Sequence, residues 1–169
     1  IGALGTTAVG GITAVQVGAL TTTQIGWLNA TQFSALSSSA IAGLTTQQVT
    51  ALNSSQIASL NSVQLAALSD RQIAVMSSSQ VAALLPSQIS TLTTTQIGDL
   101  SATQIAALSS TQLAALSATR SASLTATQVA SLTLTQLASL APSQLQALTE
   151  SAISGLTPTE MAALSTTQL

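Results

Sequence analysis

The chain lacks the side chains on which most enzymes depend. Its 169 residues contain no His, no Cys and no Tyr, and only 4% of them are charged. These absences remove common transition-metal ligands, the thiol nucleophile and the base that titrates near neutral pH. The ionisable side chains are Asp70, Arg71, Asp99, Arg120, Glu150 and Glu160. We therefore expect a protein that is not an enzyme and that has no cofactor and no metal site.

Strong charge and long apolar segments are also missing. A net charge of −2 provides no electrostatic basis for binding nucleic acid. Hydrophobic residues make up 46% of the chain, but they occur in runs of only a few residues. Since a membrane-crossing helix needs about 20 mostly apolar residues in succession, we expect no membrane span.

What the chain does contain is a strict repeat of eight residues. Gln occupies 16 of the 21 positions that are multiples of eight, and the other five hold Ala8, Ala40, Arg120, Ala152 and Glu160. Four residues before each of these positions stands Leu, in 19 of 21 repeats. The position directly after Gln is apolar throughout, except at Ser121. Such a period is typical of arrays in which each unit buries its apolar face against neighbouring units.

Each repeat carries a helix-capping signal. Ser, Thr or Asn stands three residues before the Gln position in 18 of 21 repeats. In a capping box, the Ser or Thr side chain accepts from the third backbone N–H, and the Gln side chain accepts from the N–H of the cap residue. We assign this role to Gln24, Gln32, Gln48, Gln56, Gln64, Gln72, Gln80, Gln88, Gln96, Gln104, Gln112, Gln128, Gln136, Gln144 and Glu160.

The prolines support the same frame. Pro86, Pro142 and Pro158 all fall directly after the cap position. Proline is favoured at the first helical position, because it has no N–H to leave unpaired and its φ is already helical. The sequence therefore predicts one capped helix of about six or seven residues in each repeat.

Uninterrupted elements do not explain the pattern. In a continuous α-helix, eight residues overshoot two turns by about 80°, so the Leu row would spiral around the helix. In a long strand, the Leu position and the apolar position five residues later would lie on opposite faces. We predict an all-α solenoid, or superhelix, of very short capped helices. A β-solenoid is the alternative, and the abundance of Gln, Ala and Leu speaks against it.

We expect one array over residues 1–169, cut as a window from a longer repeat region. Residues 1–20 are rich in Gly and are expected to form looser repeats. Arg120 and Ser121 replace both the box residue and the core residue of one repeat, which predicts a local weak point or a docking place.

The motif also resembles known repeat arrays. Residues 108–116, Leu-Ser-Ser-Thr-Gln-Leu-Ala-Ala-Leu, resemble the Leu-Thr-x-x-Gln-Ile-x-x-Leu arrays of very long secreted bacterial surface and fibre proteins. The resemblance implies a structural protein, extracellular or at the cell surface, that forms or contributes to a fibre, stalk or adhesin. Because no polar end repeats are visible, we expect self-association into a homomeric fibre. Alternatives are an ice-binding module and a glycan- or protein-binding repeat module.

Surface residues suggest two further interpretations. Trp27 occupies a position that points away from the core, which makes it a candidate surface anchor. The rows of Ser and Thr are candidates for covalent glycans, as on decorated stalks. Asn29-Ala30-Thr31 and Asn53-Ser54-Ser55 match the N-glycosylation pattern, although both Asn residues stand at the cap position, where Asn is favoured for its own reasons.

Overall fold

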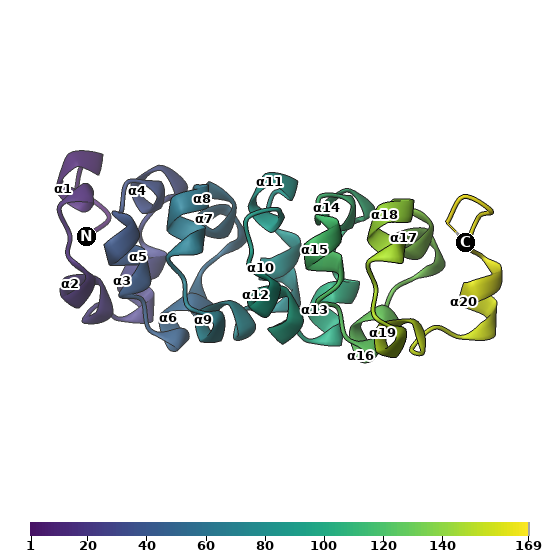
Figure 1. Cartoon of the computed structure of the whole chain (residues 1–169). Coiled ribbons are helices and arrows are strands. Elements are labelled where there is room, and N and C mark those ends of the chain that lie inside the picture. Colours follow the sequence, from purple (N-terminus) through teal and green to yellow (C-terminus); the bar gives the residue numbers. More distant parts are fainter. Residues whose placement is uncertain (169) are drawn as a thin grey trace. The chain divides into compact units, whose positions relative to one another are not determined.

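The computed structural model describes residues 1–168 and consists of short α-helices, one in each repeat as far as Ala162 (Figure 1). No strand is present in these residues. The prediction of a solenoid of short capped helices is thus confirmed, and the β-solenoid alternative is wrong. The chain forms two compact units.

The first unit comprises Ile1–Thr91. Its helices are α1 (Thr6–Gly10), α2 (Ala14–Gly18), α3 (Thr22–Gly26), α4 (Ala30–Ser34), α5 (Ser38–Ala42), α6 (Thr46–Ala51), α7 (Ser54–Ser59), α8 (Ser62–Ala66), α9 (Asp70–Ala74), α10 (Ser78–Ala82) and α11 (Pro86–Ile89).

The second unit begins at Leu92. Its helices are α12 (Thr94–Asp99), α13 (Ala102–Ala106), α14 (Ser110–Ala114), α15 (Ala118–Ser121), α16 (Ala126–Val129), α17 (Leu134–Ala138), α18 (Pro142–Gln146), α19 (Glu150–Ile153) and α20 (Pro158–Ala162).

The connection between α6 and α7 needs only two extended residues. After α6, Leu52 has φ −64° and ψ 138°, and the cap residue Asn53 has φ −84° and ψ 164°. No residue among those described has a positive φ. Because no left-handed conformation is required, the turns do not depend on glycine. The same extended backbone at Leu85 suits the residue before Pro86.

The helices are shorter than the sequence predicts, with four to six residues each. The reason lies in the last turn of each repeat. The Leu N–H there bonds to a carbonyl three residues earlier, as in Leu28 N to Ile25 O at 3.1 Å. This tighter bond closes the helix and directs the chain toward the next cap.

Stability comes from stacking, because isolated helices of this length do not persist in water. Within each unit, helices three places apart in the chain contact one another. In the first unit α5 packs on α2 and α7 packs on α4, and in the second unit α16 packs on α13 and α18 packs on α15. The chain therefore winds, and helices three repeats apart lie side by side.

Two rows of apolar side chains fill the interior of each unit. One row follows the Gln positions and includes Ile25, Phe33 and Ile57, all fully buried. The other is the Leu row, in which Leu28 and Leu36 are also buried. Burial of a side chain of this size contributes about 1.5 to 3 kcal/mol, so these rows supply most of the stabilisation. No helix of the described residues has both the length and the apolar character needed to cross a bilayer.

Candidate functional site: the glutamine ladder between turns

The Gln side chain first acts within its own repeat. In α7, the Asn53 N–H donates to Gln56 Oε1 at 3.0 Å, and the Gln56 N–H donates to Asn53 Oδ1 at 3.0 Å. Reciprocal pairs of this kind open α2, α3, α4, α6, α7, α8, α9, α10, α12, α13, α14, α16, α17 and α20.

The proline repeats keep part of this arrangement. Leu85 and Ala141 have no side-chain acceptor, but their N–H groups still donate to the Oε1 atoms of Gln88 and Gln144. Pro86 and Pro142 follow them at the first helical position. The missing side-chain acceptor is the difference from Pro158, which follows Thr157 in a complete box with Glu160.

The same Gln side chains also reach the previous turn of the winding. Gln56 Nε2 donates to Ile25 O and to Leu28 O, both at 2.9 Å. A separation of 28 residues equals three and a half repeats. The start of α7 therefore reaches the residues that follow α3, and the body of α7 packs on α4.

We call this set of inter-turn hydrogen bonds the glutamine ladder. In each case Nε2 donates to the carbonyl of the Leu-row residue 28 positions earlier and also to a carbonyl 30 or 31 positions earlier. The donors are Gln32, Gln48, Gln56, Gln64, Gln72, Gln80 and Gln88 in the first unit, and Gln128, Gln136, Gln144 and Gln168 in the second.

Because the side chain is buried, only an amide, which both accepts and donates, suits this position. Gln56 is fully buried, and its oxygen accepts from the cap while its nitrogen serves two carbonyls. A Glu carboxylate would accept from the cap but has no proton for the carbonyls. Each satisfied bond contributes about 0.5 to 1.5 kcal/mol, and an unpaired buried group costs about 1 to 3 kcal/mol. One Gln side chain thus satisfies three backbone groups that water does not reach.

From residue 32 onward, where an earlier turn is present, four repeats lack the ladder Gln. Ala40 and Ala152 have no donor, and Glu160 uses its carboxylate for the Thr157 N–H and hydroxyl. Arg120 keeps part of the function, because its Nε donates to Leu92 O and its Nη1 to Ser117 Oγ. Arg has no acceptor for the Ser117 N–H, so no box forms there.

Ser121 is the exception in the core. It is fully buried, and its Oγ has no hydrogen-bond partner. Ser121 Oγ is the one such buried side-chain atom among the described residues. Sequence analysis predicts a weak point at Arg120 and Ser121, and the structure places an unsatisfied hydroxyl there.

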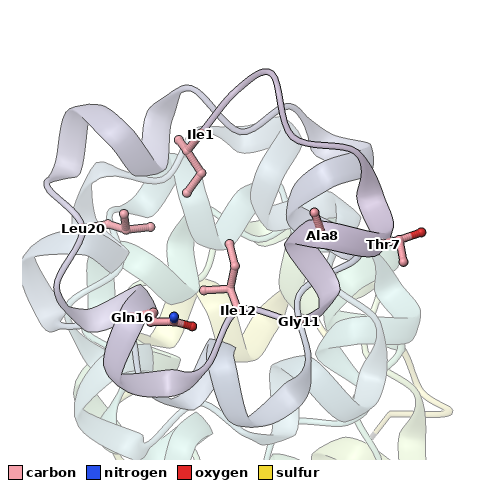
Figure 2. A pocket seen from close by; sticks show the side chains of 7 residues that line it. All are labelled: Ile1, Thr7, Ala8, Gly11, Ile12, Gln16 and Leu20. Atoms are coloured by element: carbon pink, nitrogen blue, oxygen red, sulfur yellow. The ribbon is translucent and has the colours of Figure 1, made fainter.

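The first turn of the array has an uncovered end face. A hollow of about 370 Å³ lies there, lined by Ile1, Ile12, Gln16 and Leu20 among others. Figure 2 shows the side chains of Ile1 and Ile12 extending into the middle of the ring that the first repeats form. Leu4 of the same Leu row is 40% exposed, whereas Leu28 is 1% exposed. The apolar interior is therefore open at this face.

Residues 1–20 differ from the expected looser repeats in one respect. Helix α1 follows Gly5 without a side-chain cap, but α2 has a complete box formed by Thr13 and Gln16. Sequence reasoning missed this box, although Thr13-x-x-Gln16 fits the pattern. Gln16 is exposed and Gln24 is half-buried, and within the described residues neither donates from Nε2 to an earlier turn.

Trp27 lies at the surface, at the end of α3, with 58% of its area exposed. No group of three or more His, Cys, Asp or Glu residues within residues 1–168 is close enough to hold a metal ion. The site is therefore a backbone-binding ladder of neutral amides, and its chemistry is that of recognition between turns.

One family of known repeats is similar to the first part of the chain. The sequence model of the ALTTAQ repeat matches residues 1–30 and 30–62. No curated protein and no solved structure matches the chain. The two consecutive matches show a repeat protein whose first 62 residues are similar to ALTTAQ repeats.

Proposed function

We propose that this chain is a structural, non-enzymatic repeat scaffold that forms or contributes to an extracellular or cell-surface fibre, stalk or adhesin. The observation that carries the proposal is the glutamine ladder. Each turn offers amide donors on one side and carbonyl acceptors on the other, so one contact repeats along the array without a change in geometry. Each added turn makes the same contact, so the array can extend in one direction.

Over residues 1–168, the first turn has ladder donors without an acceptor on an earlier turn, and the last turn has ladder carbonyls without a donor from a later turn. Gln16 lines the open apolar hollow of the first turn, and neither its Nε2 nor that of Gln24 donates to an earlier turn within the described residues. Near the other end, the carbonyls of Leu148 and Leu156 belong to the row that accepts Gln bonds elsewhere, and no described residue donates to them. We infer that copies of the chain associate end to end through these faces. The same contact would join further repeats in any longer chain.

Association by this route combines apolar burial with backbone hydrogen bonds. Ile12 and Leu20 are half-buried in the free end face and would become covered, as Leu28 and Leu36 are in later repeats. The near absence of charge removes the repulsion that keeps most soluble proteins apart. Both effects favour a homomeric fibre.

Two matched substitutions, one inside the hollow and one outside it, test the end-to-end contact. Ile12→Glu places a charge in the hollow, whereas Val15→Glu places it on α2 at a residue that is 82% exposed and does not line the hollow. We expect Ile12→Glu to weaken association at least about tenfold, because the charge would be buried without a partner. Val15→Glu should leave association unchanged.

The measurement is sedimentation equilibrium over a wide concentration range, with electron microscopy of the concentrated protein. Circular dichroism establishes that each variant remains helical. A wild-type chain that stays monomeric at millimolar concentration would contradict the fibre, and equal loss in both variants would contradict this face as the contact.

Covalent glycans on exposed Ser and Thr residues are a separate part of the proposal. They would supply the solubility that charge does not provide, at residues such as Thr22 and Thr23 on the exposed side of α3. The intact mass of native material tests this directly. A mass equal to that of the bare chain would remove the glycans and leave the scaffold proposal standing.

A further inference from the structure

A second hollow in the first unit is independent of the end face. It has a volume of about 740 Å³ and lies between the turn that joins α3 to α4 and the start of α7. We call it the Trp27 groove, after the residues that define it: Trp27, Asn29, Asn53, Ser54 and Ser55. Its two walls are joined by the ladder bonds of Gln56 to Ile25 O and Leu28 O. The groove is thus formed before any ligand arrives.

Trp27 is unusual at its position in the repeat. Most residues at the corresponding position in later repeats are small, for example Ala35 and Gly43. At Gly43 an added Cβ would lie 2.5 Å from Ala14 O, so the neighbouring turn restricts side-chain size there. Trp27 instead lines the groove and leaves 58% of its area exposed. The other aromatic residue, Phe33, is fully buried.

The polar groups around Trp27 are fixed and uncharged. Asn29 Oδ1 accepts from the Gln32 N–H at 2.9 Å, and Asn53 Oδ1 accepts from the Gln56 N–H at 3.0 Å. Capping therefore sets the orientation of both amides and leaves their Nδ2 groups as donors. Ser54 and Ser55 add hydroxyl groups that both donate and accept.

Charge is absent from the lining of the groove. The charged side chains of the first unit are Asp70 and Arg71, both on α9. A phosphate or carboxylate ligand would therefore find no cation, and a basic peptide would find no carboxylate. The groove offers one wide aromatic surface with neutral hydrogen-bonding groups at its edge, which matches a ligand with an apolar face and many hydroxyl groups.

We propose that the Trp27 groove binds a neutral sugar unit of an oligosaccharide. One face of a pyranose ring, with its C–H groups, stacks on the indole of Trp27. The ring hydroxyls accept from Asn29 and Asn53 Nδ2 and exchange hydrogen bonds with Ser54 and Ser55. This activity does not depend on fibre formation, since the groove lies within one unit of one chain.

The sequence provides a direct reporter for this binding. Trp27 is the only Trp and the chain has no Tyr, so tryptophan fluorescence reports on this groove alone. The probes are cellohexaose, chitohexaose and maltohexaose, added to the 169-residue chain. We expect a saturable change in emission with at least one of them, at concentrations below about 10 mM. The absence of a saturable change with all three would overturn the proposal.

Variants separate the groove from general loss of structure. Trp27→Ala, followed by calorimetry, should weaken sugar binding at least about tenfold. Asn53→Ala and Asn61→Ala remove the same cap from adjacent helices, but Asn61 does not line the groove. We expect Asn53→Ala alone to reduce affinity. An equal loss of affinity in both Asn variants would show that the effect comes from lost folding and would contradict the groove. An emission change that depends on protein concentration, and not on sugar concentration, would place Trp27 in a contact between copies.

Discussion

Helices α15 and α16 follow one another in the second unit and have four residues each, but only α16 keeps the repeat pattern. In α16, Gln128 donates to Ile97 O and Leu100 O, and Val129 is fully buried in the core. In α15, Arg120 and Ser121 take these places, and Ser121 Oγ has no partner.

The comparison shows how the array tolerates a defect. Helix α15 still forms, because Ser117 Oγ accepts from the Arg120 N–H and Arg120 Nε donates to Leu92 O. The backbone and the stacking on α18 are retained. In an array where each unit contacts only its neighbours, one poor repeat lowers local stability and leaves the rest in place. The ladder and the core row are therefore separable contributions.

The largest change in stability is expected when the buried Val129 of α16 is replaced by Ser, the residue found at this position in α15. Val129→Ser should lower the free energy of unfolding by about 3 kcal/mol, because it removes buried methyl groups and adds an unpaired buried hydroxyl. Urea unfolding monitored by circular dichroism gives the change. Thr127→Ser, at an exposed position of the same helix, should change it by less than about 0.5 kcal/mol. Equal effects at both positions would show that the core row does not stabilise this unit.

Removing the ladder residue of α16 comes next. Gln128→Ala should destabilise by about 2 kcal/mol, since the carbonyls of Ile97 and Leu100 and the N–H of Thr125 lose their partner. The control is Gln146→Ala, at an exposed Gln of α18 outside the ladder. Amide hydrogen exchange should quicken in α12 and α16 only for Gln128→Ala. Unchanged exchange rates in α12 and α16 would mean that water satisfies the freed backbone groups with no loss of stability.

Repair of the α15 core should stabilise the protein. Ser121→Val removes the unpaired hydroxyl and adds apolar burial, so we expect a gain of about 1 to 2 kcal/mol. Thr119→Val makes an exposed position on the same helix more apolar and should have almost no effect. The urea midpoint and hydrogen exchange of residues 117–124 measure the gain. A loss of stability instead would show that neighbouring side chains already fill the space that valine needs.

Repair of the α15 ladder is expected to have the smallest effect. Arg120→Gln restores an acceptor for the Ser117 N–H, but Arg120 Nε already donates to Leu92 O. We expect a gain of about 0.5 to 1 kcal/mol. Arg71→Gln removes the same charge at an exposed position of α9 and serves as the control. If both substitutions raise the urea midpoint equally, the gain comes from charge and not from the capping box.

Much of the local structure was predictable because its determinants lie within one repeat. Asn53 and Gln56, or Thr93 and Gln96, are three residues apart, and Ser/Thr/Asn-x-x-Gln before an apolar residue is a capping signal in any context. Pro86 marks the first helical position for an equally local reason. The weak repeat at Ser121 was visible as a break in an apolar row.

The inter-turn half of the ladder was not predictable in this way. Nothing within the eight residues around Gln56 indicates that its Nε2 reaches Ile25 and Leu28. That pairing depends on how many repeats make one turn of the winding, which the packing of whole helices sets. The Trp27 groove has the same origin, because Trp27 and Asn53 meet only across adjacent turns.

The sequence alone thus determined where each helix begins, which residues cap it and which two rows are apolar, since these follow from hydrogen bonds and periodicity inside one repeat. Only the tertiary structure decided that the capping Gln side chains are buried and bond to carbonyls 28 residues earlier. The physical reason is that helices of this length are stable only when stacked, and the stacking angle selects their partners.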